Sequence, residues 1–229
     1  MKYYDAETPA PDLTECFSCP GGGQELMADV FLPDSENANK AAVLFAHGGG
    51  WHTGSRAAFL WHAHRLSLFG YVTCTIDYRL TGTAVFPAAV EDCQAGVRWL
   101  RQNAKRFTIN PERIGAMGSS AGGHLVACLG VMKHIEMGIS AKANCVVDVH
   151  GVHDFVSIWE ETGELNENWM KFLGGPISEK KEEWIAASPA LHVTEDSAPM
   201  LLIHDPDDPT VPCKQTHLMV DALMEAGCP

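Results

Sequence analysis

A serine stands at the centre of a glycine-rich pentapeptide, Gly118-Ser119-Ser120-Ala121-Gly122. An apolar run precedes this motif and a helix-forming stretch follows it, which is the strand–turn–helix context of a G-x-S-x-G nucleophile elbow. So tight a turn strains the backbone of the serine and requires small residues two positions before and after it. The N-terminus of the following helix favours negative charge. The pattern predicts that Ser120 is a nucleophile and that Ser119 is the variable position of the motif.

A second glycine-rich segment, HGGGW at residues 47–51, follows another apolar run of strand length. Acyl transfer builds an oxyanion, which backbone N–H groups can stabilise where no side chain obstructs the approach. We expect the amides of Gly49, Gly50 and Ala121 to form this oxyanion hole. A glycine-rich loop can also cradle a phosphate, but neither G-x-x-x-x-G-K nor G-x-G-x-x-G is present. His47 is expected to order the loop rather than to act as a base.

Both motifs lie in a chain whose apolar runs of strand length alternate with amphipathic segments of helix length. This alternation is typical of a mostly parallel sheet covered by helices. The first two strands flank three consecutive glycines and are expected to form a hairpin. Strands are expected at residues 14–19, 25–32, 41–46, 71–76, 113–117, 143–149 and 200–204, and helices at 56–69, 88–107, 121–132 and 214–226.

One segment, from about residue 155 to 186, interrupts the alternation and is rich in charge and tryptophan. It is either a small cap over the site or a solvated helical excursion whose tryptophans pack on the sheet. With no linker, repeat or low-complexity tract in view, we expect residues 1–229 to form one α/β domain with this excursion.

The composition restricts the partners of the chain. It has 16 Lys and Arg residues against 29 Asp and Glu residues, a formal net charge of −13. Such a surface repels nucleic-acid phosphates and anionic lipids, so a neutral small molecule is the favoured partner. No apolar run is long enough to span a bilayer, and the first residues contain no signal-peptide core. We therefore expect no nucleic-acid or membrane partner, a cytoplasmic location and eight reduced cysteines.

These motifs together resemble the α/β-hydrolases of the hormone-sensitive-lipase-like and bifunctional feruloyl/acetyl-xylan esterase-like groups. The resemblance covers residues 25 to 229, and the tryptophan after the three glycines favours the feruloyl/acetyl-xylan branch. It implies a three-layer α/β-hydrolase fold and a serine esterase that cleaves small acyl or carbohydrate-linked esters without a metal or organic cofactor. Further matching motifs are DYRL at 77–80, FP at 86–87, NPERI at 110–114, FLGG at 172–175, ASP at 187–189 and PMLLIH at 199–204.

The resemblance also implies a catalytic acid in the segment HDPDDPTVP at residues 204–212. In the family this acid lies in a pattern like H-G-x-x-D-x-x-V-P, which places it at Asp208. Asp205 stands where the family has glycine, and a proline follows it, so Asp207 remains an alternative. A calcium loop is a weaker interpretation, because prolines interrupt the segment and the Gly–Glu frame of an EF-hand is absent.

The catalytic histidine of this fold follows the acid along the chain, after one more strand. We therefore expect it beyond Pro229, and expect this chain to be a fragment without the C-terminal strand and helix, impaired or inactive as it stands. Other histidines are weaker candidates: His124 is expected to pack, His217 lies apart, and His62 and His64 face different sides of a helix. His150 and His153 flank a glycine at a strand end near the site rim, with nothing to show that they face Ser120.

Three other functions remain open on the sequence. An arylformamidase or a peptidase of the same fold would use the same groups, because they also cleave amides. A catalytically inactive hydrolase-fold binding module would fit a missing histidine. A metal-dependent hydrolase could use the 11 histidines of the chain.

Overall fold

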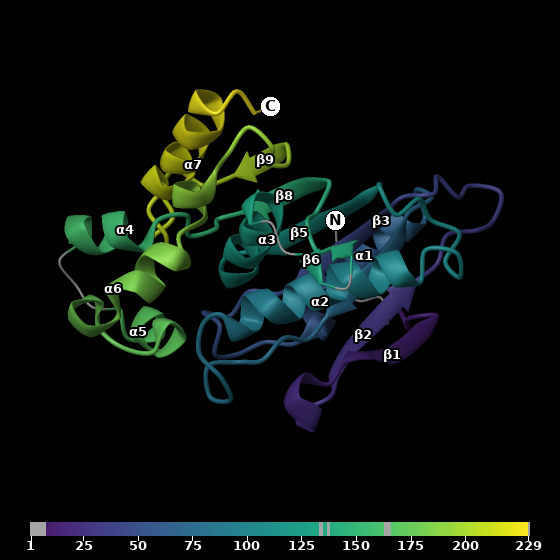
Figure 1. Cartoon of the computed structure of the whole chain (residues 1–229). Coiled ribbons are helices and arrows are strands. Elements are labelled where there is room, and N and C mark those ends of the chain that lie inside the picture. The colour runs from purple at the N-terminus through teal and green to yellow at the C-terminus, as the bar shows by residue number, and fades with distance from the viewer. Residues whose placement is uncertain (1–7, 133–134, 137, 163–165, 229) are drawn as a thin grey trace.

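The fold is that of a computed structural model, and it is described for residues 8–132, 135–136, 138–162 and 166–228. A seven-stranded sheet forms its centre (Figure 1). Its strands are β1 (Leu13–Ser18), β2 (Leu26–Phe31), β3 (Ala42–Ala46), β4 (Val72–Ile76), β5 (Ile114–Ser119), β8 (Cys145–Val149) and β9 (Met200–Ile203). The strand order is β1-β2-β4-β3-β5-β8-β9. The first three strands in this order pair antiparallel, and β4, β3, β5, β8 and β9 run parallel.

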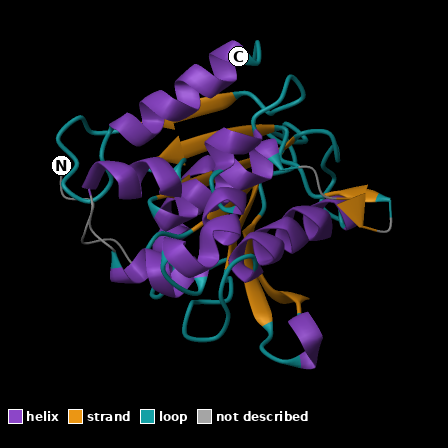
Figure 2. Ribbon diagram, turned by 60° about the vertical axis from the view of Figure 1, so that its left-hand side comes forward, coloured by secondary structure: helices purple, strands orange, loops and turns teal. Residues whose placement is uncertain are grey.

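Helices cover both faces of this sheet, so its central strands are buried on both sides (Figure 2). All five residues of β4 are buried, the polar Thr73 and Thr75 among them, as expected of a strand that is covered on both faces. Neighbouring side chains of β3 point to opposite faces of the sheet. Leu44 lies in the main core, whereas Phe45 packs in a second cluster with Phe59 and Ala63. The helices outside the excursion are α1 (Leu60–Ser67), α2 (Ala88–Gln102), α3 (Ala121–Val131) and α7 (Lys214–Glu225).

The segment that interrupts the alternation contains three helices, α4 (Phe155–Thr162), α5 (Glu167–Leu173) and α6 (Ile177–Ala186). They form a group beside the sheet in Figure 1. Residues 163–165 of the expected excursion lie outside the described residues. Trp169, Phe172 and Trp184 are buried. These side chains therefore pack inward, while the charged side chains in the described part of the segment are exposed or half-exposed.

Most element boundaries differ from the sequence prediction by one or two residues. Two differences are larger. The helix expected at 56–69 divides into a 3-10 turn, η2 (Arg56–Phe59), and α1, and the helix expected to reach 107 ends at residue 102. A short hairpin of β6 (Ile135–Glu136) and β7 (Ile139–Ser140) was not predicted, because two-residue strands carry no periodicity. Among the described helices, none has the length and apolar character needed to cross a membrane.

Candidate functional site

The serine of the pentapeptide occupies a strained turn at the carboxyl end of β5. Ser120 has φ 55° and ψ −120° and lies directly between β5 and the first residue of α3. A non-glycine residue in such a conformation costs about 1–3 kcal/mol and persists only where its surroundings hold it. Its N–H donates to the carbonyl of Val149 at 2.7 Å, and its carbonyl accepts from the N–H of His124 at 3.0 Å. The turn is therefore held from both sides.

The two glycines of the motif are needed for space. A Cβ on Gly118 would lie 2.2 Å from the carbonyl oxygen of Gly122. A Cβ on Gly122 would lie 2.0 Å from the carbonyl oxygen of Ala46 at the end of β3. Real Cβ atoms do not approach backbone this closely, so the spacing of the motif follows from the close contact of β3, β5 and α3.

The HGGGW loop lies against the nucleophile candidate. A Cβ on Gly48 would lie 2.8 Å from the carbonyl oxygen of Ser119 and 3.4 Å from Cβ of Ser120. Gly49 and Gly50 have φ values of 118° and 58°, which favour glycine. Within the described ranges, the N–H groups of Gly49, Gly50 and Ala121 donate to no backbone carbonyl. Ala121 begins α3, where the first N–H groups of a helix have no intrahelical acceptor. The predicted donors are therefore available, and their role stays a prediction.

A buried network fixes this loop to the helix behind the serine. The indole of Trp51 stacks on the Phe172 ring of the excursion, with centroids 4.6 Å apart and planes at 16°. Its Nε1–H donates to Nδ1 of His124 at 3.2 Å, and Nε2–H of His124 donates to the carbonyl of Ala187 at 2.8 Å. Burial lowers the pKa of His124 to about 4, against the effect of the Ala187 hydrogen bond. His124 is thus a neutral bridge and packs in the interior.

His47 orders the same loop. Its ring stacks on Tyr78, with centroids 4.2 Å apart, and its Nδ1–H donates to the carbonyl of Gly48 at 2.7 Å. Burial lowers the pKa of His47. The Tyr78 hydroxyl donates to the carbonyl of His47 at 2.9 Å. These contacts occupy the ring and hold the loop, in agreement with its expected role.

The structure distinguishes the two candidate acids after β9. Asp208 Oδ2 lies 2.6 Å from His150 Nδ1, and Oδ1 accepts from the amides of Thr210 at 2.7 Å and Val211 at 3.0 Å. Burial raises the pKa of Asp208, but these hydrogen bonds outweigh it and lower the pKa to about 2. Asp208 is therefore ionised at neutral pH. Asp207 is exposed.

The histidine beside the acid was not predicted. His150 directly follows β8, has φ 59°, and is 31% exposed at its side chain. Its N–H donates to the carbonyl of Ile203 at 2.9 Å, which ties the turn to β9. The expectation that the histidine partner of Asp208 lies beyond Pro229 stays a prediction, but Asp208 already contacts an imidazole. The available signal was that both residues follow neighbouring parallel strands at the same edge of the sheet.

A second acid–histidine pair is buried beneath the first turn of α3. Asp148 and His153 are at most 1% exposed, and Nε2 of His153 forms a close hydrogen bond with Asp148 Oδ2. His153 Nδ1–H donates to the carbonyl of Gln215 at 3.0 Å, and Gln215 Oε1 accepts from the amides of His153 and Asp154. A Cβ on Gly123 would lie 2.1 Å from Asp148 Oδ1. This pair fixes the loop after His150 to α3 and α7.

The same edge of the sheet contains a possible metal-ligand group. Atoms of His150, His204 and Asp208 lie within 4.8 Å of one another. However, His204 Nδ1 accepts from the Thr216 hydroxyl at 2.7 Å, and its Nε2–H donates to the carbonyl of Val211 at 2.8 Å. Both ring nitrogens of His204 are already engaged. The group therefore fits a metal poorly, because ligation would break one of these hydrogen bonds.

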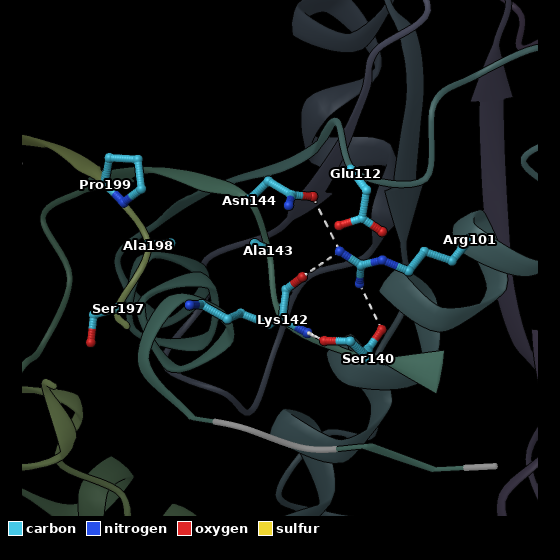
Figure 3. Close-up of a pocket in the computed structure, with 9 residues that line it drawn as sticks. All are labelled: Arg101, Glu112, Ser140, Lys142, Ala143, Asn144, Ser197, Ala198 and Pro199. Carbon is cyan, nitrogen blue, oxygen red and sulfur yellow. Dashed lines mark hydrogen bonds between the residues drawn. The ribbon is translucent and has the colours of Figure 1, made fainter. Parts of the chain in front are cut away.

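A pocket of about 320 Å³ lies at the opposite edge of the sheet, where β5, β8 and β9 begin (Figure 3). Arg101 crosses it and donates to the carbonyls of Ser140 at 2.6 Å and Lys142 at 2.7 Å, and to Asn144 Oδ1 at 3.1 Å. These hydrogen bonds hold the loop before β8. The pocket is separated from Ser120 by the length of the strands and takes no part in the candidate site.

A family model described as BD-FAE matches residues 28–223. The chain belongs to the BD-FAE family. This BD-FAE protein is also similar to esterase LipC of Mycobacterium tuberculosis, with 29% identity over 212 residues that cover 86% of this chain and 52% of LipC. It is 26% identical over 219 residues to the isoprenylcysteine alpha-carbonyl methylesterase ICME of Arabidopsis thaliana, covering 87% and 50%. The chain thus spans about half the length of these curated relatives.

The chain is also similar to solved esterase structures. The structure of esterase Est2 from Thermogutta terrifontis with bound butyrate has a TM-score of 0.81 and 28% identity, covering 98% of this chain and 82% of that one. The same esterase phosphorylated by paraoxon has a TM-score of 0.78 and 27% identity, covering 98% and 82%. The BD-FAE chain therefore has the predicted α/β-hydrolase fold.

Proposed function

We propose that this chain is a serine-dependent carboxylic ester hydrolase that acts on small acyl or carbohydrate-linked esters of the acetyl or feruloyl type. The observation that carries the proposal is the backbone of Ser120, at φ 55° between β5 and α3, with the HGGGW loop against its Cβ. A strained serine at such a turn has a catalytic explanation, because the strain exposes Oγ beside backbone donors.

The reaction follows from the positions of these groups. Ser120 Oγ attacks the ester carbonyl, and the amides of Gly49, Gly50 and Ala121 hold the oxyanion that forms. The alcohol leaves, and water then hydrolyses the acyl-enzyme. An imidazole accepts the serine proton, and the ionised Asp208 orients that ring and stabilises its charged form.

Two features support a small, uncharged ester as the substrate. Structures of the Thermogutta terrifontis esterase, to which this chain is similar, carry butyrate or propionate. The formal net charge of −13 disfavours polyanionic substrates. Because the same groups also cleave amides, rates on p-nitrophenyl acetate, a feruloyl ester and an N-formyl aromatic amine would rank the esterase above the arylformamidase alternative if both esters react faster.

The test is p-nitrophenyl acetate hydrolysis by the 229-residue chain and two serine variants. We expect Ser120→Ala to lower kcat/KM by at least about 10³-fold. Ser119→Ala, the matched control one residue away, should retain most of the rate. Turnover by the unmodified chain that clearly exceeds the uncatalysed rate and is unchanged in Ser120→Ala would contradict the proposal.

A further inference from the structure

We propose that His153 is an imidazolium held by the Asp148 carboxylate, and that this buried ion pair fixes the Ser120 turn relative to the loop of Asp208. The inference rests on the ester hydrolase function proposed above, because it gives the pair a positioning role in that reaction. Both residues act through the segments that carry the candidate nucleophile and the candidate acid.

The Asp148 carboxylate lies between the turns that follow β5 and β8. Asp148 pairs in the sheet register with Gly118, which lies two residues before Ser120. A Cβ on Gly123, in the first turn of α3, would lie 2.1 Å from Oδ1 of Asp148, and a Cβ on Gly151 would lie 2.4 Å from Oδ2. Glycine at both positions leaves the space that the carboxylate fills. The carboxylate therefore packs directly on the backbone of both turns.

His153 connects this carboxylate to the helix that follows the Asp208 loop. Its Nδ1 lies 3.0 Å from the carbonyl oxygen of Gln215, in the first turn of α7, and its Nε2 contacts Asp148 Oδ2. Gln215 Oε1 accepts from the amides of His153 at 2.8 Å and Asp154 at 2.7 Å. One network therefore joins α3, the loop after β8 and the start of α7, which continues the segment that contains the candidate acid.

The acceptors on the two sides of the ring determine how many protons it carries. The Gln215 carbonyl can only accept, so its contact requires a proton on Nδ1 of His153. A carboxylate can also only accept, so the contact with Asp148 Oδ2 requires a second proton, on Nε2. A neutral imidazole beside an ionised Asp148 would turn a lone pair toward one of these two oxygen atoms. Histidine is the stronger base of the two residues, so the proton between Nε2 and Oδ2 belongs to the ring.

The burial of the pair makes a countercharge necessary. Asp148 and His153 are at most 1% exposed. Within the described ranges, Oδ1 of Asp148 has no hydrogen-bond donor, so the contact with His153 is the one that compensates the carboxylate. A buried carboxylate without a cation is strongly destabilising. The positive charge of His153 therefore holds Asp148 in place between the two turns.

Two ionisable side chains of α3, His124 and Cys128, lie within electrostatic reach of the pair. Burial is the main reason why the pKa of His124 falls to about 4, and the positive charge of His153 also lowers it, against the charge of Asp148. Burial likewise raises the pKa of Cys128, and the Asp148 carboxylate adds to this effect. Both side chains are uncharged at neutral pH, so neither supplies Asp148 with a countercharge.

Nitrogen NMR of the imidazole rings tests the protonation of His153. In the uniformly nitrogen-15-labelled chain at pH 7, we expect both ring nitrogens of His153 to resonate as protonated. His217, exposed on α7, should instead show an average of its neutral and charged forms. His153→Gln assigns the signals by their loss. An unprotonated Nε2 of His153 in the unmodified chain would overturn the ion pair.

Asp148→Asn separates the charge of the pair from its shape. The asparagine NH₂ group can donate to Nε2 of a neutral His153, so the variant keeps a hydrogen bond at this point and loses the carboxylate. We expect the ring of His153 to become neutral in this variant, with its proton on Nδ1. A ring that stays doubly protonated in Asp148→Asn would show that Asp148 does not hold the imidazolium.

Hydrolysis of p-nitrophenyl acetate tests the positioning role. We expect kcat to fall by about 10–10²-fold in Asp148→Asn and in His153→Gln, with little change in KM, because the Ser120 turn shifts relative to the Asp208 loop. His217→Gln is the control and should keep its rate. Since the two residues act as one pair, the double variant should lose no more than either single variant. Losses that multiply in the double variant would contradict a shared role.

The two proposals fail in different ways. Asp148→Asn is nearly isosteric, so it covers the case in which His153→Gln folds poorly. If Asp148→Asn turns over as fast as His217→Gln while Ser120→Ala is inactive, the positioning role is wrong and the proposed function stands. If turnover above the uncatalysed rate is unchanged in Ser120→Ala, the proposed function is wrong, whereas the NMR result on His153 still decides the ion pair.

Discussion

The indole Nε1–H of Trp51 donates to Nδ1 of His124 at 3.2 Å, and this bond joins the glycine loop to the helix that follows Ser120. Trp51 directly follows Gly50, and His124 lies in the first turn of α3. His124 is held in turn by the carbonyl of Ala187 at the end of the excursion. One neutral imidazole therefore sets the distance between the proposed oxyanion donors and Ser120.

Replacement of Trp51 by phenylalanine isolates this hydrogen bond. Trp51→Phe keeps an aromatic ring against Phe172 but leaves the buried Nδ1 of His124 without a donor. We expect the free energy of unfolding in urea to fall by about 1–3 kcal/mol. We also expect the fold-decrease in kcat to exceed the fold-change in KM. Trp61→Phe, at a position 41% exposed on α1, is the control. Equal unfolding free energies of the two variants would show that this hydrogen bond does not contribute to stability.

The low pKa of His124 predicts acid sensitivity. The folded state holds this pKa near 4, whereas the unfolded chain titrates near 6.5. The unfolded chain therefore binds the proton first, and the contribution of neutral His124 is complete above about pH 6.5. It is lost as the pH falls toward 4, by up to about 3 kcal/mol. Unfolding free energies at pH 7 and pH 4.5 should differ less in His124→Gln than in the unmodified chain or His217→Gln.

Asp208 and its neighbour Asp207 offer a matched pair of variants. In Asp208→Asn, either the NH₂ group or the carbonyl oxygen of the asparagine side chain faces His150. The substitution also removes the negative charge that stabilises an imidazolium. We expect kcat to fall by up to about 10⁴-fold, whereas Asp207→Asn, on an exposed side chain, should remain near the original rate. Comparable losses in both variants would argue that the loop, rather than the carboxylate of Asp208, supports turnover.

The same carboxylate also predicts a pH dependence of stability. Its folded pKa of about 2 lies below the ordinary value of 3.8. The stabilisation is therefore complete above about pH 4 and is lost as the pH falls through the folded pKa near 2. Unfolding free energies measured between pH 5 and pH 2.5 should decline more steeply for the unmodified chain than for Asp208→Asn. Parallel curves would mean that the His150, Thr210 and Val211 hydrogen bonds do not favour the ionised form.

Two glycines of α3 allow crowding against a fixed side chain to be compared with crowding against a flexible one. A Cβ on Gly123 would lie 2.1 Å from Asp148 Oδ1, in a buried and already bonded carboxylate. A Cβ on Gly130 would instead meet the flexible end of Met200 at 2.5 Å and Cγ2 of Val146 at 2.9 Å, so most of its crowding is against a side chain that can move. We expect Gly123→Ala to lower the unfolding free energy by about 1–3 kcal/mol and Gly130→Ala to lower it less. The reverse order in urea unfolding would show that Asp148 moves freely.

Local constraints explain which features the sequence predicted. The hydrophobic patterning located all seven strands of the main sheet. The central strands are mostly buried, whereas the edge strands β1 and β9 alternate between half-buried and exposed residues. The strained turn at Ser120 was predictable, because the requirement for glycine at 118 and 122 acts within five residues. Asp208 was predicted as the acid from the family pattern; of the two candidates it is the one that contacts an imidazole, and its role stays a prediction.

Long-range placement explains what the sequence did not predict. His150 and Asp208 are 58 positions apart, and Trp51 and His124 are 73 apart. Their contacts depend on how β8, β9 and the glycine loop are placed side by side. The left-handed residue of the turn after β8 is His150 itself and not a glycine or an asparagine, the residue types that usually adopt this conformation. A histidine in such a turn carries no pattern that distinguishes it from the other ten in the chain.

The central claim is that Ser120 is the nucleophile, and covalent trapping tests it most directly. After incubation with paraoxon, mass spectrometry of the intact chain and of its peptides would locate any diethylphosphoryl group. The account predicts one group per chain, on the peptide that contains Ser120, retained in Ser119→Ala and absent in Ser120→Ala. Labelling of another residue, or undiminished labelling of Ser120→Ala, would contradict it.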